Sequence, residues 1–189
     1  MMSKGIIIFG AMGTGKTTLG KALAQLLNFH HFDLDDYLFR RDTDIPMSVI
    51  DSKENRTKRL LSDIAKSPHF VMSGQMWSIR KTFEPLFDLG VFITAPTEVR
   101  VERVHSREMS RWGNRINSGG DMYKIHQESL FLTEQYDAGE PPVVCLKRDE
   151  QWETELLCPV LRVDGTKAIA ENALWLAEQY PSYVHNGRT

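Results

Sequence analysis

Short apolar runs alternate along the chain with longer segments in which apolar and polar residues recur at helical spacing. The apolar runs predict five strands, near residues 5–9, 31–33, 69–73, 90–95 and 159–164. The longer segments predict helices near residues 18–28, 48–65, 97–107, 122–136 and 168–180. Regular alternation of strands and helices is typical of a mostly parallel sheet that carries helices on both faces. The pattern therefore predicts an α/β protein built as a three-layer αβα sandwich.

Two segments lack a clear period. Residues 111–121 contain three glycines and predict a flexible loop between two helices. Residues 138–157 contain a glycine and two prolines and read as irregular, although the apolar run at 143–146 predicts an extra strand or an edge hairpin.

The most informative segment follows the first predicted strand. Residues 10–17 read G-A-M-G-T-G-K-T, which is the G-x-x-x-x-G-K-T pattern of a phosphate-binding loop, or P-loop. Glycines let backbone N–H groups approach phosphate oxygens, and the helix that follows directs its positive dipole end at them. We expect ATP to be bound by Gly10, Met12, Gly13, Thr14, Gly15, Lys16, Thr17 and Thr18. Lys16 would contact the β- and γ-phosphates, and the Thr17 hydroxyl would be a ligand of Mg²⁺.

Carboxylates follow the second predicted strand, and not the third. Asp33, Asp35 and Asp36 come at the end of the second strand, whereas the third strand ends in Ser-Gly-Gln. In a doubly wound sheet, ligands collect at the carboxyl ends of the strands. One carboxylate there can hold Mg²⁺, and a second can accept a proton from an attacking hydroxyl group. Capping of a helix N-terminus is the alternative role for these aspartates.

This combination of a P-loop with F-D-L-D at residues 32–35 resembles the shikimate and gluconate kinase branch of the P-loop small-molecule kinases. The resemblance implies the P-loop nucleoside triphosphate hydrolase fold, with a five-stranded parallel sheet in the order 2-3-1-4-5. It also implies ATP and Mg²⁺ as cofactors, with Asp33 beside the metal and Asp35 as the base that faces the acceptor.

Two further stretches are similar to the wider adenylate kinase superfamily. R-V-H-S-R, from Arg103 to Arg107, is similar to the motif that opens the lid of nucleoside monophosphate kinases. The similarity implies that Arg103 lies near adenine and that Arg107 reaches phosphates. Arg111 and Arg115 continue the same helix face or lie in the lid loop. The V-D-G-T-K segment that contains Gly165 and Lys167 is similar to the adenine-binding loop of adenylate kinases. A solvated helix of Glu–Arg pairs and a plain strand-to-helix turn are the alternative interpretations.

The acceptor side is less well defined, because the loop after the third strand departs from both families. Shikimate kinases carry three glycines there, and adenylate kinases carry an arginine; here the loop supplies an aromatic ring, an amide and a late arginine. The candidate acceptor-binding residues are Asp33, Asp35, Arg56, Gly74, Gln75, Trp77 and Arg80. Arg59 is an alternative to Arg56, because the register of this helix is ambiguous.

Length and composition limit the number of domains and the classes of binding partner. The chain has 189 residues, 23 Lys and Arg against 25 Asp and Glu, and 41% hydrophobic residues. This suits a single P-loop domain over residues 1–189, with an acceptor-binding helical region at about 34–66 and a lid at about 107–121. The net charge of −2 argues against a nucleic-acid or membrane binder. Two cysteines without a C-x-x-C pattern predict neither disulfides nor a zinc site, and we expect a cytoplasmic protein.

The hypothesis for function is transfer of the γ-phosphoryl group of Mg-ATP to a hydroxyl group of a small metabolite. Lys16, Asp35, Arg107 and Arg111 are the candidate catalytic residues, and Thr17 and Asp33 are the candidate metal ligands. A nucleoside monophosphate kinase is one alternative. A nucleotide-dependent binding or regulatory ATPase without an acceptor is the other. The acceptor itself is left open by the sequence.

Overall fold

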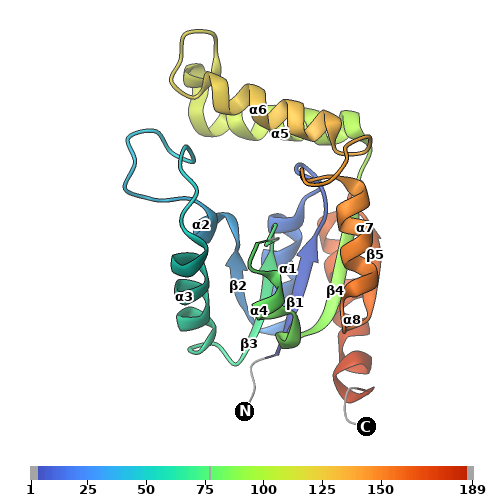
Figure 1. Cartoon of the computed structure of the whole chain (residues 1–189). Coiled ribbons are helices and arrows are strands. Elements are labelled where there is room, and N and C mark those ends of the chain that lie inside the picture. The colour runs from blue at the N-terminus through green and yellow to red at the C-terminus, as the bar shows by residue number, and fades with distance from the viewer. Residues whose placement is uncertain (1–3, 77, 187–189) are drawn as a thin grey trace.

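The five strands form one parallel sheet in a computed structural model, which describes residues 4–76 and 78–186 (Figure 1). They are β1 (Lys4–Phe9), β2 (His30–Asp33), β3 (His69–Ser73), β4 (Phe87–Thr94) and β5 (Val160–Asp164). Their order is β2-β3-β1-β4-β5, and each neighbouring pair is parallel. The predicted fold class and strand order are thereby confirmed. The described residues contain no helix that is both long and apolar enough to span a membrane.

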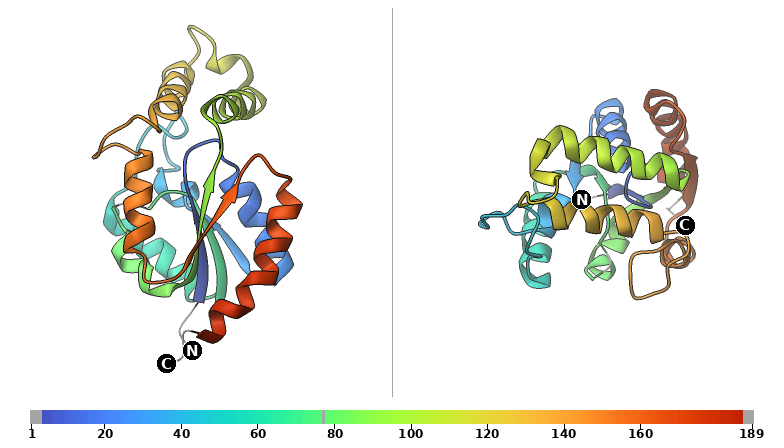
Figure 2. Two further views of the ribbon diagram at one scale, coloured as in Figure 1. Left: turned by 90° about the vertical axis from the view of Figure 1, so that its right-hand side faces the viewer. Right: turned by 90° about the horizontal axis from the view of Figure 1, so that it is seen from above.

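Helices cover both faces of the sheet (Figure 2). One face carries α1 (Lys16–Leu27) and α8 (Ile169–Asn186). The opposite face carries α3 (Lys53–Ile64), α4 (Arg80–Phe83), the short η1 (Glu84–Leu86) and α7 (Leu146–Glu155). A short α2 (Asp35–Leu38) follows β2 directly.

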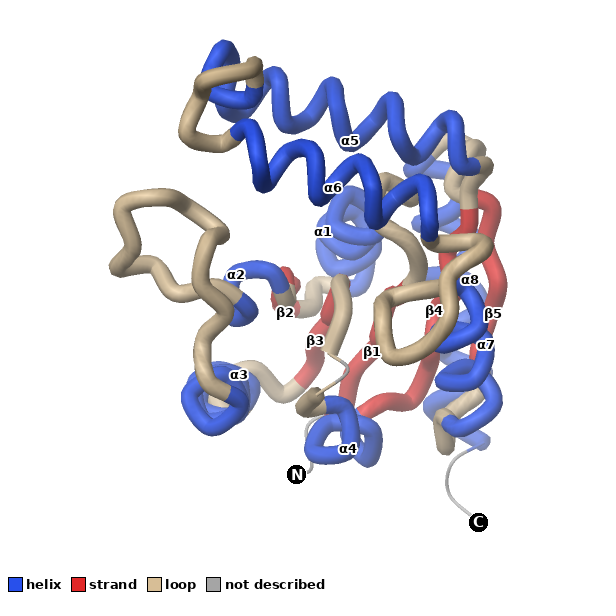
Figure 3. Tube along the Cα trace, turned by 45° about the horizontal axis from the view of Figure 1, so that its top comes forward, coloured by secondary structure: helices blue, strands red, loops and turns tan. Residues whose placement is uncertain are grey.

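Two helices stand above the carboxyl ends of the strands (Figures 1 and 3). They are α5 (Thr97–Trp112) and α6 (Tyr123–Gln135), joined through the short η2 (Gly113–Ile116). Together they form a helical hairpin, and the lid expected at about 107–121 occupies its tip. Between the two helices, the buried His126 bonds to the buried Glu108 (Nδ1 to Oε2, 2.6 Å) and to the exposed His105 (Nε2 to Nδ1, 3.1 Å).

The alternation of β1 side chains creates two cores. Ile6 and Ile8 face α1 and α8, whereas Ile7 and Phe9 face α3 and α7. Phe9 stacks on Phe92 of β4 with 5.0 Å between ring centroids, so the central strands are buried on both faces. Such burial explains why these strands read as continuous apolar runs in the sequence.

Several element boundaries differ from the prediction. Helix α3 begins at Lys53 and not near residue 48, because the Ser52 side chain caps it by accepting from the Asn55 amide (3.1 Å). Strand β4 begins three residues earlier than expected, at Phe87, and α5 continues beyond Arg107 to Trp112.

The prediction of an extra strand or edge hairpin at 143–146 is wrong. Cys145 is extended, but a helix, α7, begins at the next residue. Cys145, Asp149 and Trp152 are all fully buried, and their spacing of four and three places them on one face of that helix. Because Asp149 is one of these three residues, the sequence shows no apolar repeat at helical spacing here, and the helix was not predicted.

Candidate functional site

The P-loop joins β1 to α1 and depends on glycine at its turns. Gly10, Gly13 and Gly15 have φ values of 136°, 80° and 101°, which side chains rarely tolerate. A Cβ on Gly10 would lie 2.2 Å from the backbone oxygen of Ile93, and one on Gly13 would lie 2.4 Å from that of Arg100. The loop is therefore packed against the end of β4 and the base of α5, and its backbone forms the nest that a phosphate requires.

Lys16 is the cation of this nest. Its Nζ donates to the backbone oxygen of Ala11 at 2.6 Å. Desolvation lowers the pKa of Lys16, and the charges of Asp35 and Asp149 oppose that shift while Arg107 adds to it. Four titratable side chains thus lie near the ammonium group: Asp33 of β2, Asp35 of α2, Arg107 of α5 and Asp149 of α7.

Asp33 and Asp35 lie together, as their spacing predicted. Asp33 ends β2, and its Oδ1 accepts a hydrogen bond from the Asp35 backbone amide at 3.2 Å. Asp35 is exposed at the protein surface, although the protein atoms around its carboxyl group reduce its solvation. Desolvation first, and the charge of Asp33 second, raise the pKa of Asp35, whereas Lys16 and Arg107 lower it. A raised pKa beside a phosphate-binding lysine suits a general base.

The donor set at the start of α1 fits a magnesium nucleotide. Thr17 lies in the first turn of α1, directly after Lys16 and the glycine nest. Asp33 supplies a carboxylate close enough to raise the pKa of Lys16. Hydroxyl and carboxylate oxygens are the ligands that Mg²⁺ prefers.

Two segments that are far apart in sequence, α5 and the loop after β5, meet beside the P-loop. Arg103 of α5 donates from Nη1 to the backbone oxygen of Gly165 at 2.9 Å. A Cβ on Gly165 would lie 2.5 Å from the backbone oxygen of Thr14, so the loop after β5 touches the P-loop. The residues predicted for the adenine side therefore lie together. Lys167 of the same loop bonds to Glu171 at 3.2 Å at the surface.

Of the two arginines predicted to be catalytic, Arg107 lies near Lys16 and Asp35, whereas Arg111 lies at the far end of α5. Arg107 is close enough to Lys16 and Asp35 to lower the pKa of both groups, although its side chain is 53% exposed. Arg111 lies at the end of α5, with its guanidinium carbon 4.7 Å from the centre of the Trp112 ring. The catalytic role of Arg111 stays a prediction that requires movement of the lid tip.

Gly74 and Gln75 lie at the third-strand end, beside the P-loop. The Gly74 amide donates to the backbone oxygen of Ile8 at 3.1 Å. Gln75 donates from Nε2 to the backbone oxygen of Gly10 at 3.0 Å and to Asp149 at 3.4 Å. Trp77 lies outside the described residues.

The two acceptor-side arginines have protein partners. Arg56 of α3 is 8% exposed, and its Nη2 donates to the Ser78 hydroxyl at 2.7 Å. Arg80 of α4 forms ion pairs with Glu84 and Glu155. The roles of both arginines in acceptor binding stay predictions.

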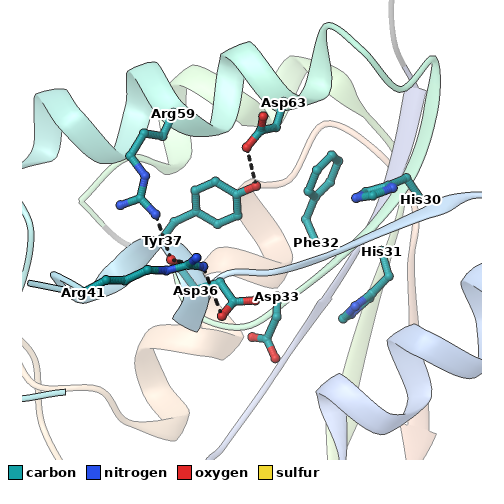
Figure 4. A pocket seen from close by; sticks show the side chains of 9 residues that line it. All are labelled: His30, His31, Phe32, Asp33, Asp36, Tyr37, Arg41, Arg59 and Asp63. Atoms are coloured by element: carbon teal, nitrogen blue, oxygen red, sulfur yellow. Dashed lines mark hydrogen bonds and ion pairs between the residues drawn. The ribbon is translucent and has the colours of Figure 1, made fainter. Parts of the chain in front are cut away.

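A cavity of about 330 Å³ lies at the edge strand β2 (Figure 4). It is lined by His30, His31, Phe32, Asp33, Asp36, Tyr37, Arg41, Arg59 and Asp63. Several lining groups pair with one another: Arg59 donates to the Asp36 backbone oxygen at 3.0 Å, and Tyr37 donates to Asp63 at 2.9 Å. Asp33 lines this cavity and Asp35 does not, so the cavity adjoins the candidate metal ligand and not the candidate base.

Sequence reasoning missed Asp149, although it is fully buried and close to Lys16. No motif marks it, because it lies in the segment that read as irregular. The only available signal was the helical spacing of Cys145, Asp149 and Trp152, which includes one charged residue.

We expect Gly13→Ala to lower the affinity for nucleotide by about 100-fold, because the new Cβ would force the P-loop or the base of α5 to move. Gly119→Ala is the matched control, since Gly119 also has a positive φ (87°) but its Cβ would meet nothing within 4 Å. Titration with fluorescent ADP and thermal melting would measure both. Equal nucleotide affinities in the two variants would contradict the tight packing of the loop.

Comparisons with known proteins agree with this geometry. A family model described as "AAA domain" matches residues 6–122. "Uncharacterized protein YqaC" of Bacillus subtilis (strain 168) is 32% identical over 174 residues, which cover 90% of this chain and 93% of that protein. A shikimate kinase of Neisseria meningitidis serogroup C is 29% identical, covering 72% and 79% of the two chains. The structure of a shikimate kinase from Acinetobacter baumannii in complex with shikimate aligns with a TM-score of 0.57 and 20% identity, covering 95% and 94%.

Proposed function

The chain belongs to the AAA domain family of P-loop proteins, within the shikimate kinase-like superfamily of small-molecule kinases, and from that membership we propose that it transfers the γ-phosphoryl group of ATP to a hydroxyl group of a small metabolite. The observation that carries the proposal is the position of Asp35. A carboxyl group with a raised pKa lies beside the P-loop lysine and within the electrostatic reach of Arg107. A protein that only binds nucleotide has no need for such a base.

The residues suggest a division of labour. The P-loop backbone and Lys16 hold the β- and γ-phosphates, while Arg103 and Gly165 frame the base of the nucleotide. The acceptor oxygen attacks the γ-phosphorus as its proton passes to Asp35, and the bond to the β–γ bridging oxygen breaks to release ADP. Arg107 stabilises the charge on the transferring group. Mg²⁺, held by Thr17 and Asp33, would neutralise phosphate charge.

The polar groups favour a hydroxyl acceptor without a phosphate group. An acceptor phosphate needs a guanidinium with free donors, and Arg80 at the third-strand loop is engaged by Glu84 and Glu155. Shikimate is a natural first compound to test, because relatives carry the name shikimate kinase.

The experiment measures ADP release from Mg-ATP in the presence of two pools of compounds. One pool contains phosphate-free hydroxyl compounds, namely sugar acids, polyols, nucleosides and shikimate; the other contains nucleoside monophosphates. We expect the first pool to stimulate ADP release well above the acceptor-free rate, because water is a poor substitute for a bound acceptor. Stimulation by monophosphates alone would instead indicate a nucleoside monophosphate kinase. Nucleotide binding without stimulation by either pool would favour a regulatory ATPase.

A further inference from the structure

Asp149 is a buried carboxyl group that the proposed phosphotransfer does not use, and it connects the end of α6 to the P-loop. Its Oδ2 accepts hydrogen bonds from the hydroxyl of Tyr136, at the end of α6, and from Nε2 of Gln75 at 3.4 Å. Gln75 Nε2 also donates to the backbone oxygen of Gly10 at 3.0 Å. A continuous chain of hydrogen bonds therefore runs from α6 through α7 to the first glycine of the P-loop.

Two oxygens of this chain lack a donor. Asp149 Oδ1 and Gln75 Oε1 are buried and have no hydrogen-bond partner within the described part of the chain. Rotating the Gln75 amide does not solve the problem. The Gly10 carbonyl can only accept, so the amide nitrogen must face it. Buried acceptors without donors are costly, and native proteins rarely leave two of them in one pair of hydrogen-bonded side chains.

We propose that Asp149 is a carboxylic acid whose Oδ1–H donates to Gln75 Oε1, so that the two side chains form a two-point acid–amide pair that positions the P-loop. A single proton then gives every polar atom of the pair a partner. Oδ2 accepts from Tyr136 and Gln75, Oδ1 donates, and Oε1 accepts. Asp149 acts through Gln75 on the Gly10 carbonyl, so it is a positioning residue and touches no substrate.

The electrostatic surroundings agree with a neutral acid. The polar and charged groups that face Asp149 are Lys16 from α1, Tyr136 from the end of α6, Gln75 from the loop after β3 and Arg148 from its own helix. Desolvation raises the pKa of Asp149, and it outweighs the opposing effects of the Tyr136 hydrogen bond and the charge of Lys16. An anionic Asp149 would also attract Lys16 away from phosphates and repel the phosphates themselves.

Nucleotide binding should therefore be linked to this proton. This step rests on the proposed function, because it requires Lys16 to bind phosphate. Once Lys16 contacts phosphate, an Asp149 anion loses much of its counter-charge, and the neutral form is favoured further. Above the pKa of Asp149, affinity should fall with rising pH by up to about tenfold per unit. Asp149→Asn should remove this dependence, because an asparagine amide donates to Gln75 Oε1 and accepts from Tyr136 and Gln75 as the acid does.

The test is the affinity for fluorescently labelled Mg-ADP from about pH 5 to pH 9 in the wild type, Asp149→Asn and Glu150→Gln. Glu150 is the matched control: it lies on the same helix, and its exposed carboxylate pairs with Arg162 at 3.7 Å. At the acidic end, we expect the wild type and Asp149→Asn to bind labelled ADP with equal affinity. At the basic end, we expect the affinity of the wild type to be lower than that of Asp149→Asn by a factor of about ten or more. Glu150→Gln should follow the wild type. The nucleotide titrates equally in all three proteins, so the ratios isolate the ionisation of Asp149 together with its effect on Lys16. A weaker Asp149→Asn at the acidic end would overturn the proposal.

Infrared spectroscopy tests the pair without nucleotide or turnover. With ¹³C-labelled aspartate, a protonated carboxylic acid gives an isotope-sensitive C=O band that should shift in Tyr136→Phe, because Tyr136 bonds to the carbonyl oxygen. This assignment holds even if Asp149→Asn does not fold. Absence of the band at neutral pH would overturn the proposal, whatever the affinities. If the wild type bound no nucleotide at any pH, the proposed function would fail, while the band would still decide the acid–amide pair.

Discussion

Lys16→Ala should reduce phosphoryl transfer by about a thousandfold or more, with the loss expressed mainly in kcat. The Lys16 ammonium is the central cation of the site: it sits in the glycine nest and faces titratable side chains from β2, α2, α5 and α7. Removing a preorganised charge that faces the transferring group typically costs a factor of about 10² to 10³, and this lysine also binds the ground-state phosphates. Initial-rate kinetics with a stimulating acceptor would measure the loss.

Lys21→Ala is the matched control, because Lys21 lies on the same helix with its side chain exposed to solvent. It removes one positive charge from α1 without touching the P-loop. We expect its rate to stay within about twofold of the wild type, since exposed charges contribute little across solvent. A Lys16→Ala variant that kept full activity would mean that the glycine loop merely joins β1 to α1.

Asp35→Asn should lower kcat by about 10² to 10⁴ while leaving the affinity for ATP nearly unchanged. An amide cannot accept the acceptor proton, but it occupies the same space at the start of α2. We expect the variant to melt no lower than the wild type, because it removes an anion that desolvation already disfavours. Thermal melting alongside kinetics would separate lost chemistry from lost folding.

The dependence of the reaction rate on pH tests the role of Asp35 as the general base. The general base works only when ionised, so the wild-type rate should fall as pH drops through the Asp35 pKa. Because desolvation and Asp33 raise that pKa, this decline should begin at a higher pH than for an ordinary aspartate, whose pKa is about 3.9. The same limb should vanish from the residual activity of Asp35→Asn.

Asp36→Asn distinguishes the two neighbouring carboxylates. The Oδ1 atom of Asp36 lies 3.5 Å from Nη2 of Arg41, and Asp36 lines the cavity at the β2 edge, which Asp35 does not. Its replacement should change kcat by no more than about twofold. If Asp36→Asn abolished activity and Asp35→Asn did not, the proposed base would be the wrong carboxylate by one residue.

Local patterns in the sequence were sufficient to predict the strands of the sheet and the P-loop. The apolar run before Gly10, the glycines with positive φ and the lysine that starts α1 are all specified within 20 consecutive residues. Continuous apolar runs identified the buried strands because a parallel sheet is covered on both faces. The strand order followed from a family resemblance and not from any local pattern. The Asp33–Asp35 pairing was predictable because both residues follow one strand end.

Interactions between distant segments were decided only by the tertiary structure. The contact of Arg103 with Gly165 spans 62 residues, and the bond from Gln75 to Gly10 spans 65. The sequence suggested that Arg80 serves the acceptor, whereas the fold brings Glu155 of α7 to its guanidinium. A side chain's partners depend on which helices pack beside it, and spacing along the chain carries no such information.

Asp149 illustrates this division most clearly. In the sequence it is one acidic residue among several in a segment that lacked an apolar stripe. The fold buries it completely, places it between Tyr136 and Gln75, and brings it close to Lys16. Burial is what changes the chemistry of a carboxyl group, and burial is a property of the packed structure. The sequence alone thus determined the strand, glycine loop and lysine that would bind nucleotide, whereas tertiary packing decided which titratable side chains surround them.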